Sequence, residues 1–282
     1  MVLVRTLAVA AVFGLVVAAL LAVTLVVCLG PNRIRSVSIG AVLARDRLRQ
    51  VAPYAGALVT ILVLNKGLRE WTWALSDLIG YEATGLFYRV EGDLAAAVQT
   101  AIPDAAAVYF VAVYMFGYGL VLVAPIVLYL FAESLRPLKT LLAAYTINYA
   151  VGIAVYVVVI AHGPRIASDS SKGIIQEAFP YFTLLTGQVN SPTNVFPSLH
   201  TSMSVTVLAL AVLTRDQFPR WLTIAAALTP SIVVATVYLG IHWLIDVLAG
   251  VVLAVAAVAA ARRIVDPDGR SSRTRSSGAT RE

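Results

Sequence analysis

The sequence has few cysteines, few charged residues and few histidines. Its single cysteine, Cys28, lies inside an apolar run, so an intrachain disulfide framework is excluded. Charged residues make up only 13% of the 282 residues, whereas hydrophobic residues make up 60% and the mean hydropathy is +0.85. This balance excludes an ordinary soluble domain. The chain is therefore predicted to be an integral membrane protein, with the lipid bilayer as its partner.

The apolar residues form continuous runs rather than alternating ones, which predicts helical spans and not a β-barrel. A helix needs about 20 apolar residues to cross the hydrocarbon core. The strong candidates are Leu7–Leu29, Ala105–Phe131, Leu141–Ala161, Leu199–Leu213, Leu222–Leu239 and Trp243–Ala261. A seventh run, Val51–Leu64, is short enough to be a re-entrant segment instead. The expected fold class is an all-α, polytopic membrane helical bundle.

Basic residues are concentrated in some of the segments between these runs and not in others. They gather in residues 31–50, 132–140, 214–221 and 262–281, which the positive-inside rule places in the cytoplasm. Residues 65–104 lack a basic excess and are predicted to be external, and alternation places 162–196 outside as well. The expected topology has seven spans in the cell membrane, with the C-terminus inside. This topology explains the net charge of +6, so no nucleic-acid partner is expected.

Three regions are expected along the chain. Residues 1–30 form an N-terminal transmembrane helix, because this run lacks the small-residue cleavage site of a signal peptide. Residues 31–264 form the main membrane domain. Residues 265–282 are rich in Ser, Arg and Gly and are predicted to be a disordered basic tail.

Within the external segment 65–104, apolar residues repeat at helical spacing from Phe87 to Ile102. The repeat predicts one helix lying along the membrane surface. Such a helix would be either a connector or a lid over a substrate site.

The three histidines, His162, His200 and His242, all fall at span boundaries on the predicted external side. In the stretch HWLID, His242 and Asp246 are four residues apart and share a helix face. The carboxylate of Asp246 is therefore able to fix the imidazole tautomer, which leaves the other ring nitrogen free as a base or nucleophile.

Two further stretches place anion-binding groups on the same side. In FPSLH, Ser198 is suited to cap a helix whose positive end is a natural anion site. His200 lies in the first turn of that helix, where it is placed to give a proton to a bound group. In HGPR, Arg165 presents a planar donor fork that matches phosphate oxygens.

The motifs F-P-S-L-H at Phe196–His200 and Y-L-G-I-H-W-L-I-D at Tyr238–Asp246 together resemble the type 2 phosphatidic acid phosphatase superfamily. This family contains lipid phosphatases and vanadium haloperoxidases. The resemblance implies a six-helix core, to which this chain would add an N-terminal span. It also implies catalytic roles: His242 is the nucleophile, Asp246 orients it and His200 protonates the leaving oxygen. Ser198 and Arg165 would bind the phosphate, with Arg165 replacing the family's usual first motif.

Two departures from the family pattern resemble the branch that contains inositol phosphorylceramide synthases. Leu199 replaces the usual glycine, and Thr236 stands where the family has a second arginine. The expected function is a metal-independent phosphatase of membrane lipid phosphates or polyprenyl diphosphates. It would act at the extracytoplasmic face through a phosphohistidine intermediate and use no cofactor. The alternative is a phosphoinositol-type headgroup transferase that uses the same site.

Three other classes of protein remain as alternatives from the residues alone. A metal hydrolase would use His200, His242 and Asp246 as a facial triad. A serine hydrolase would pair Ser198 with a histidine, but no Gly-x-Ser-x-Gly elbow is present. A transporter would place ionisable groups near the bilayer midplane, whereas the centres of these runs carry none.

Overall fold

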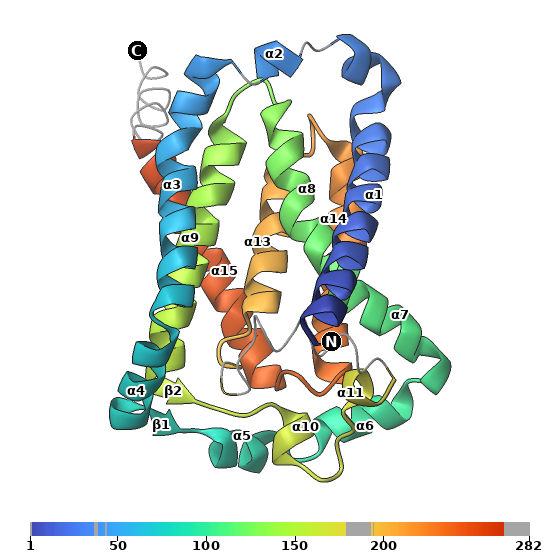
Figure 1. The fold of residues 1–282 in the computed structure, drawn as a ribbon, viewed down its shortest axis with the longest axis vertical. Helices are drawn as coiled ribbons and strands as arrows, with labels where there is room; N and C mark the ends of the chain where they lie inside the picture. Colours follow the sequence, from blue (N-terminus) through green and yellow to red (C-terminus); the bar gives the residue numbers. More distant parts are fainter. Residues whose placement is uncertain (1, 37–38, 43, 179–192, 194, 268–282) are drawn as a thin grey trace, which may run out of the picture.

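The computed structural model describes residues 2–36, 39–42, 44–178, 193 and 195–267, and in these ranges the chain is a bundle of long helices (Figure 1). Six helical stretches in the described part are long and apolar enough to cross a membrane: Thr6–Gly30 within α1 (Val2–Ser36), α3 (Arg45–Gly67), the stretch Asp104–Leu130, α9 (Arg136–Val158), α14 (Pro219–Tyr238) and α15 (Leu244–Val265). The predicted all-α membrane bundle is confirmed. The predicted tail lies outside the described residues from 268 onward.

The short run Val51–Leu64 is part of a longer helix than its apolar residues suggest. It lies within α3, which has 23 residues and so meets the length of a span. Helix α3 packs along α9, while most of its other side chains are exposed. These observations favour a full span over a re-entrant segment.

Helix α13 (Leu199–Leu213), in contrast, is shorter than a typical span, because it has only 15 residues. A helix of that length is about 22 Å long, which is shorter than the hydrocarbon core. Helix α13 packs against α8, α9, α14 and α15. Because other helices enclose it on several sides, it does not have to match the bilayer thickness along its whole length.

The apolar stretch 105–131 does not form one regular helix. It begins with a 3₁₀ turn, Asp104–Ala106, and continues as α7 (Ala107–Ala112), a π-helical turn over Val113–Gly117 and α8 (Tyr118–Leu130). π-Helical turns inside α-helices occur frequently at functional sites. Here the turn carries Tyr114, which lies beside His200.

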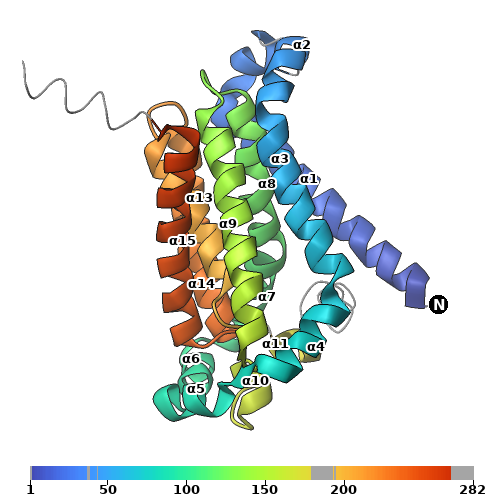
Figure 2. The same ribbon diagram turned by 90° about the vertical axis from the view of Figure 1, so that its left-hand side faces the viewer.

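The N-terminal helix is peripheral to the bundle. It packs on α8 and α14, and Figure 2 shows it leaning away from the other helices toward its N-terminus. Many of its apolar side chains are exposed, Leu15 and Val23 among them. This exposure is typical of a helix that faces lipid, as expected for a span added to a core.

The described parts of the basic segments predicted to be cytoplasmic meet at one end of the bundle, near α2 (Ile39–Val42) in Figure 1. There the Arg47 guanidinium donates to the Leu130 carbonyl at 2.8 Å, and the Lys139 ammonium donates to the Gln50 side chain at 3.1 Å. These bonds join segments that the charge pattern placed on one side of the membrane. Which leaflet this end faces stays a prediction.

The short elements gather at the opposite end of the bundle (Figure 1). They are α4 (Arg69–Ile79), β1 (Tyr81–Glu82), α5 (Thr84–Glu91), α6 (Leu94–Ala101), β2 (Val159–Ile160), α10 (Pro164–Ala167) and α11 (Ile174–Ala178). Strands β1 and β2 pair in parallel, with Tyr81 opposite Val159. The site described below lies at this end.

The single surface helix predicted from Phe87 to Ile102 is wrong in one respect. The segment forms two helices, α5 and α6, because Gly92 adopts a left-handed conformation (φ +55°) that ends α5. Residues 81–101 contain β1, α5 and α6 and are part of the stretch 65–104 that is predicted to be external. Only residues 81–101 are called the external segment below. Phe87, Ala95 and Gln99 are buried against the bundle, so the external segment packs on the end of the bundle.

Candidate active site

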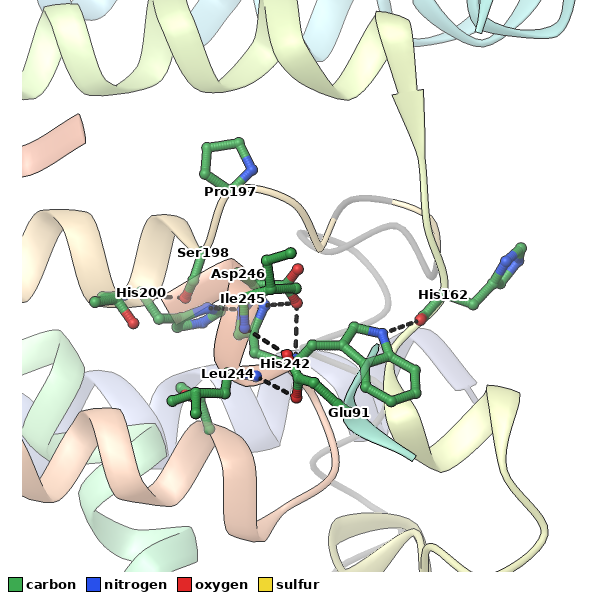
Figure 3. A network of polar contacts seen from close by, with 12 residues as sticks. Glu91, His162, Pro197, Ser198, His200, His242, Leu244, Ile245 and Asp246 are labelled. Carbon is green, nitrogen blue, oxygen red and sulfur yellow. Dashed lines mark hydrogen bonds and ion pairs between the residues drawn. The ribbon is translucent and has the colours of Figure 1, made fainter. Parts of the chain in front are cut away.

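The two histidine-containing motifs of the sequence meet through three side chains at the starts of α13 and α15 (Figure 3). His200 Nδ1 lies 3.2 Å from His242 Nε2, and His242 Nδ1 lies 3.4 Å from Asp246 Oδ2. His242 and Asp246 are almost fully buried, at 2% and 0% exposure. The carboxylate accepts from the imidazole, so the network assigns the proton of His242 to Nδ1 and a lone pair to Nε2.

The first turn of α13 is fixed against α15 by backbone contacts. The Ser198 side chain caps α13 by accepting from the Thr201 amide at 3.2 Å, as its sequence position predicts. The Ser198 amide donates to the Asp246 carbonyl at 3.0 Å, which ties the two motifs together. At Gly250 a Cβ would lie 2.6 Å from the Ser198 carbonyl oxygen, so only glycine permits this approach of the helices.

Asp246 also sets the start of α15. Its Oδ2 accepts from the Trp243 amide at 2.8 Å, three residues earlier, as a capping carboxylate does. The Trp243 indole donates to the His162 carbonyl at 2.8 Å. One carboxylate therefore orients the His242 imidazole and fixes the turn that carries it.

Arg165 reaches the site from α10 because its loop packs closely against the turn before α15. Glycines at both contact points, Gly163 and Gly240, permit this packing. The Arg165 amide donates to the Gly240 carbonyl at 3.0 Å, and Gly240 holds a φ of +65°, which side chains rarely adopt. Burial lowers the pKa of the Arg165 guanidinium, although an arginine keeps its charge in proteins. A partly buried cation close to two imidazoles suits an anionic ligand.

The charge of Arg165 acts on the nucleophile predicted from the sequence. Burial, and secondarily the positive charge of Arg165, lower the pKa of His242 to about 3, against a smaller opposing effect of a backbone hydrogen bond to Val195. His242 is therefore neutral at physiological pH, as a nucleophilic imidazole must be. The start of α13 and Arg165 both lie near the His242 ring, and their positive charge favours a negative ligand there.

Comparison with protein families agrees with this geometry. The model of the PAP2 superfamily matches residues 88–260, which is more than half of the chain and includes every residue of the site. The chain belongs to the PAP2 superfamily. Membership indicates a phosphatase or phosphotransferase type of activity. No curated protein and no solved structure matches the chain, and its place in the inositol phosphorylceramide synthase branch stays a prediction.

The five predicted site residues of this PAP2 protein lie together, whereas the third histidine of the chain, His162, stands apart from them. His200, His242, Asp246, Ser198 and Arg165 converge at one end of the bundle. His162 lies at the same end, but its ring points away from His242 (Figure 3) and its Nδ1 lies 3.4 Å from the Thr84 hydroxyl. The His162 carbonyl, and not its ring, links it to the site by accepting from the Trp243 indole.

The alternative chemistries drawn from the sequence do not match the geometry. His200, His242 and Asp246 are arranged in series, whereas a facial triad requires three ligands that converge on one point. Within the described residues, no group of three His, Cys, Asp or Glu side chains is arranged to hold a metal ion. In the same part of the chain, no hydrogen bond joins the Ser198 hydroxyl to a histidine.

Sequence reasoning missed the aromatic wall beside His200. The rings of Tyr114 and Tyr118 lie 5.0 and 4.7 Å from the His200 ring, measured between centroids. Tyr114 lies in the π-helical turn and Tyr118 is the first residue of α8, and both rings face His200 at the start of α13. In the sequence these tyrosines lie inside an apolar run, where nothing separates them from ordinary membrane-span residues.

The fit of Gly163 against the turn before α15 leads to a prediction. A Cβ at Gly163 would collide with the Ile241 carbonyl oxygen, a backbone atom that cannot rotate away. We expect Gly163→Ala to move Arg165 away from His242 and to lower kcat/KM at least about tenfold. Gly85→Ala, at a helical position with open space around it, is the matched control. An equal loss of kcat/KM in Gly163→Ala and Gly85→Ala, or no loss in either variant, would contradict this role of Gly163.

The lowered pKa of His242 predicts a pH dependence of stability. In the unfolded chain this imidazole takes up a proton near its ordinary pKa of about 6.5, whereas in the folded protein it stays neutral down to about 3. Its contribution to stability is therefore complete above pH 6.5 and is lost as the pH falls toward 3. We expect the unfolding temperature in detergent to fall less steeply from pH 7 to 5 in His242→Gln than in the parent. An equal fall in unfolding temperature for His242→Gln and the parent between pH 7 and 5 would refute this expectation.

Proposed function

We propose that this PAP2 protein hydrolyses lipid phosphates or polyprenyl diphosphates at the extracytoplasmic membrane face, through a phosphohistidine intermediate. The single observation that carries the proposal is the chain of contacts from His200 to His242 to Asp246. It supplies a neutral, oriented nucleophile and an adjacent proton donor at a site that also contains Arg165. Phosphoryl transfer requires these groups and stabilisation of charge on the equatorial oxygens.

In the first step, His242 Nε2 attacks phosphorus, forming the N–P bond while the bond to the leaving oxygen breaks. His200, as the imidazolium that the phosphate charge favours, gives its proton to that oxygen. Asp246 stabilises the positive charge that develops on His242. Arg165, the Ser198 hydroxyl and the positive end of α13 would bind the phosphate oxygens.

In the second step, a water molecule loses a proton to His200 and attacks phosphorus. The N–P bond breaks, phosphate leaves and the lone pair returns to His242 Nε2. Headgroup transfer would use the same two steps with an alcohol in place of water. The position of the site supports a membrane substrate, because the catalytic groups lie at the end of spanning helices and not in a separate soluble domain.

Charge distribution supports an external site. The basic segments meet at the opposite end of the bundle, which the positive-inside rule places in the cytoplasm. Lipid phosphates in the outer leaflet would then reach the site without crossing the membrane.

The test is a panel of lipid phosphates and polyprenyl diphosphates presented to the purified protein in proteoliposomes of known orientation. Phosphate release and the lipid products are measured with and without added alcohols such as inositol. Release of inorganic phosphate that alcohols do not change supports hydrolysis, whereas a phosphorylated alcohol identifies transfer. Absence of both products with every lipid would reject the proposal.

A further inference from the structure

The N-terminus of α15 is held by a carboxylate from a distant part of the chain. The first amide groups of a helix have no partner within it, and those of α15 follow directly after His242. The Leu244 amide donates to Glu91 Oε2 at 2.8 Å, and the Ile245 amide donates to Glu91 Oε1 at 2.6 Å (Figure 3). Both oxygens of Glu91, at the end of α5, are therefore bound to the first turn of the helix that carries Asp246.

The surrounding contacts of the external segment reinforce this arrangement. The Tyr88 ring meets the Trp243 ring edge-on at 6.3 Å, next to His242. Phe87 packs on Phe196 with ring centroids 5.4 Å apart, just before Ser198. The segment thus contacts the starts of both helices that supply the catalytic side chains.

Two more bonds extend these contacts to the loops around Arg165. Asp93 Oδ1 accepts from the Ser168 hydroxyl at 2.7 Å, at the end of α10. The Gln99 side chain donates to the Tyr238 carbonyl at 2.9 Å, at the end of α14. The external segment is therefore neither a simple connector nor a free lid in this conformation: it fixes each loop of the site from outside.

Charge gives Glu91 a second effect. Two helices direct their positive ends toward the site, and each attracts anions. Glu91 neutralises the end of α15, whereas at α13 the cap is the uncharged hydroxyl of Ser198. The substrate phosphate would then be directed to α13 and Arg165, and not to the backbone of α15.

We propose that Glu91 is a positioning residue of the site: through the α15 backbone it holds the His242–Asp246 pair in register with His200. This inference rests on the proposed function, because it assigns Glu91 a part in the same phosphoryl transfer. Glu91 touches neither imidazole, so its removal is expected to slow the chemical step more than it weakens substrate binding.

The experiment compares Glu91→Ala, Glu91→Gln and the parent, with the best lipid phosphate of the panel as substrate. We expect Glu91→Ala to lower kcat by about 10- to 100-fold, as a displacement of about 1 Å at a catalytic group does, while KM changes less than about threefold. Glu91→Gln keeps the shape of the side chain and one acceptor oxygen, so its kcat should lie between that of Glu91→Ala and that of the parent. Glu177→Ala, an exposed carboxylate of α11 at the same end, is the matched control and should behave as the parent.

The possible outcomes separate this inference from the proposed function. If the parent releases no phosphate, the proposed function fails and the inference fails with it. If the parent is active and Glu91→Ala has a kcat within twofold of it, or a KM that rises in proportion to the loss, the inference alone is overturned. Unfolding temperatures in detergent are measured for each variant. If Glu91→Ala does not fold, Glu91→Gln decides: a lower kcat at unchanged KM supports the inference, and an unchanged kcat overturns it.

Discussion

Replacing His242 by alanine is expected to lower turnover of a lipid phosphate by about 10⁴-fold or more, the scale seen when a catalytic nucleophile is removed. The variant loses the nitrogen that the proposed mechanism uses as the nucleophile. Asp246 and His200 would remain, but they would have no group to activate. The measurement is steady-state phosphate release, together with a test for a phosphorylated enzyme after quenching with alkali, in which phosphoramidate bonds survive.

His162→Ala is the matched control for this experiment. His162 lies at the same end of the bundle, but its ring contacts Thr84 and points away from His242. Its carbonyl bond to the Trp243 indole does not depend on the side chain, so we expect activity within a few-fold of the parent. Equal phosphate release by His242→Ala and the parent, or a label retained in His242→Ala, would remove His242 from the mechanism.

Replacing Arg165 by alanine is expected to lower kcat by about 10²- to 10³-fold, as loss of an oxyanion donor does. Charge on the equatorial oxygens is largest in the transition state, and Thr236 offers no second guanidinium where the family has one. Arg165→Lys retains a charge but not the planar fork, so its kcat should fall between the alanine variant and the parent. The loss should appear with every substrate of the panel, because a phosphoryl group is transferred from all of them.

Arg89→Ala provides the control for charge alone. Arg89 is an exposed arginine of α5 at the same end of the bundle, and its removal should change kcat less than about twofold. A loss in Arg89→Ala as large as in Arg165→Ala would indicate that general surface charge, and not a phosphate contact, is responsible. No loss in Arg165→Ala would remove it from the site.

The spans were predictable because each depends on local composition. An apolar run long enough to cross the bilayer is visible in the sequence without any tertiary contact, and the charges between runs add sidedness. The boundaries were less predictable. Helix α3 continues through polar residues before Val51, and α13 is short because the surrounding helices shield it. The π-helical turn before α8 has no compositional signal, since it changes hydrogen bonding and not polarity.

The candidate catalytic residues were visible in the sequence because they stand close together in two short motifs. The expected shared helix face of His242 and Asp246 is wrong, however. His242 precedes the N-cap of α15, and Asp246 reaches back to it as the capping carboxylate. The sequence had no means of pairing Glu91 with Leu244, because the two are 153 residues apart and no local pattern connects them. Tyr114 and Tyr118 were hidden for a different reason: only the path of α8 past α13 makes them part of the site.

The hydrogen bond between the His200 and His242 rings implies that the resting site has no room for a phosphoryl group beside His242 Nε2. Phosphorus must come within about 3 to 3.5 Å of Nε2 before attack, with the departing oxygen on the far side and within reach of His200. A separation of 3.2 Å between the two nitrogens leaves no space for a phosphorus atom between them. In the proposed mechanism, the incoming phosphoryl group would therefore have to separate the two imidazoles before attack. The rings would meet again when phosphate departs, and this contact would shield the nucleophile from solvent between catalytic cycles.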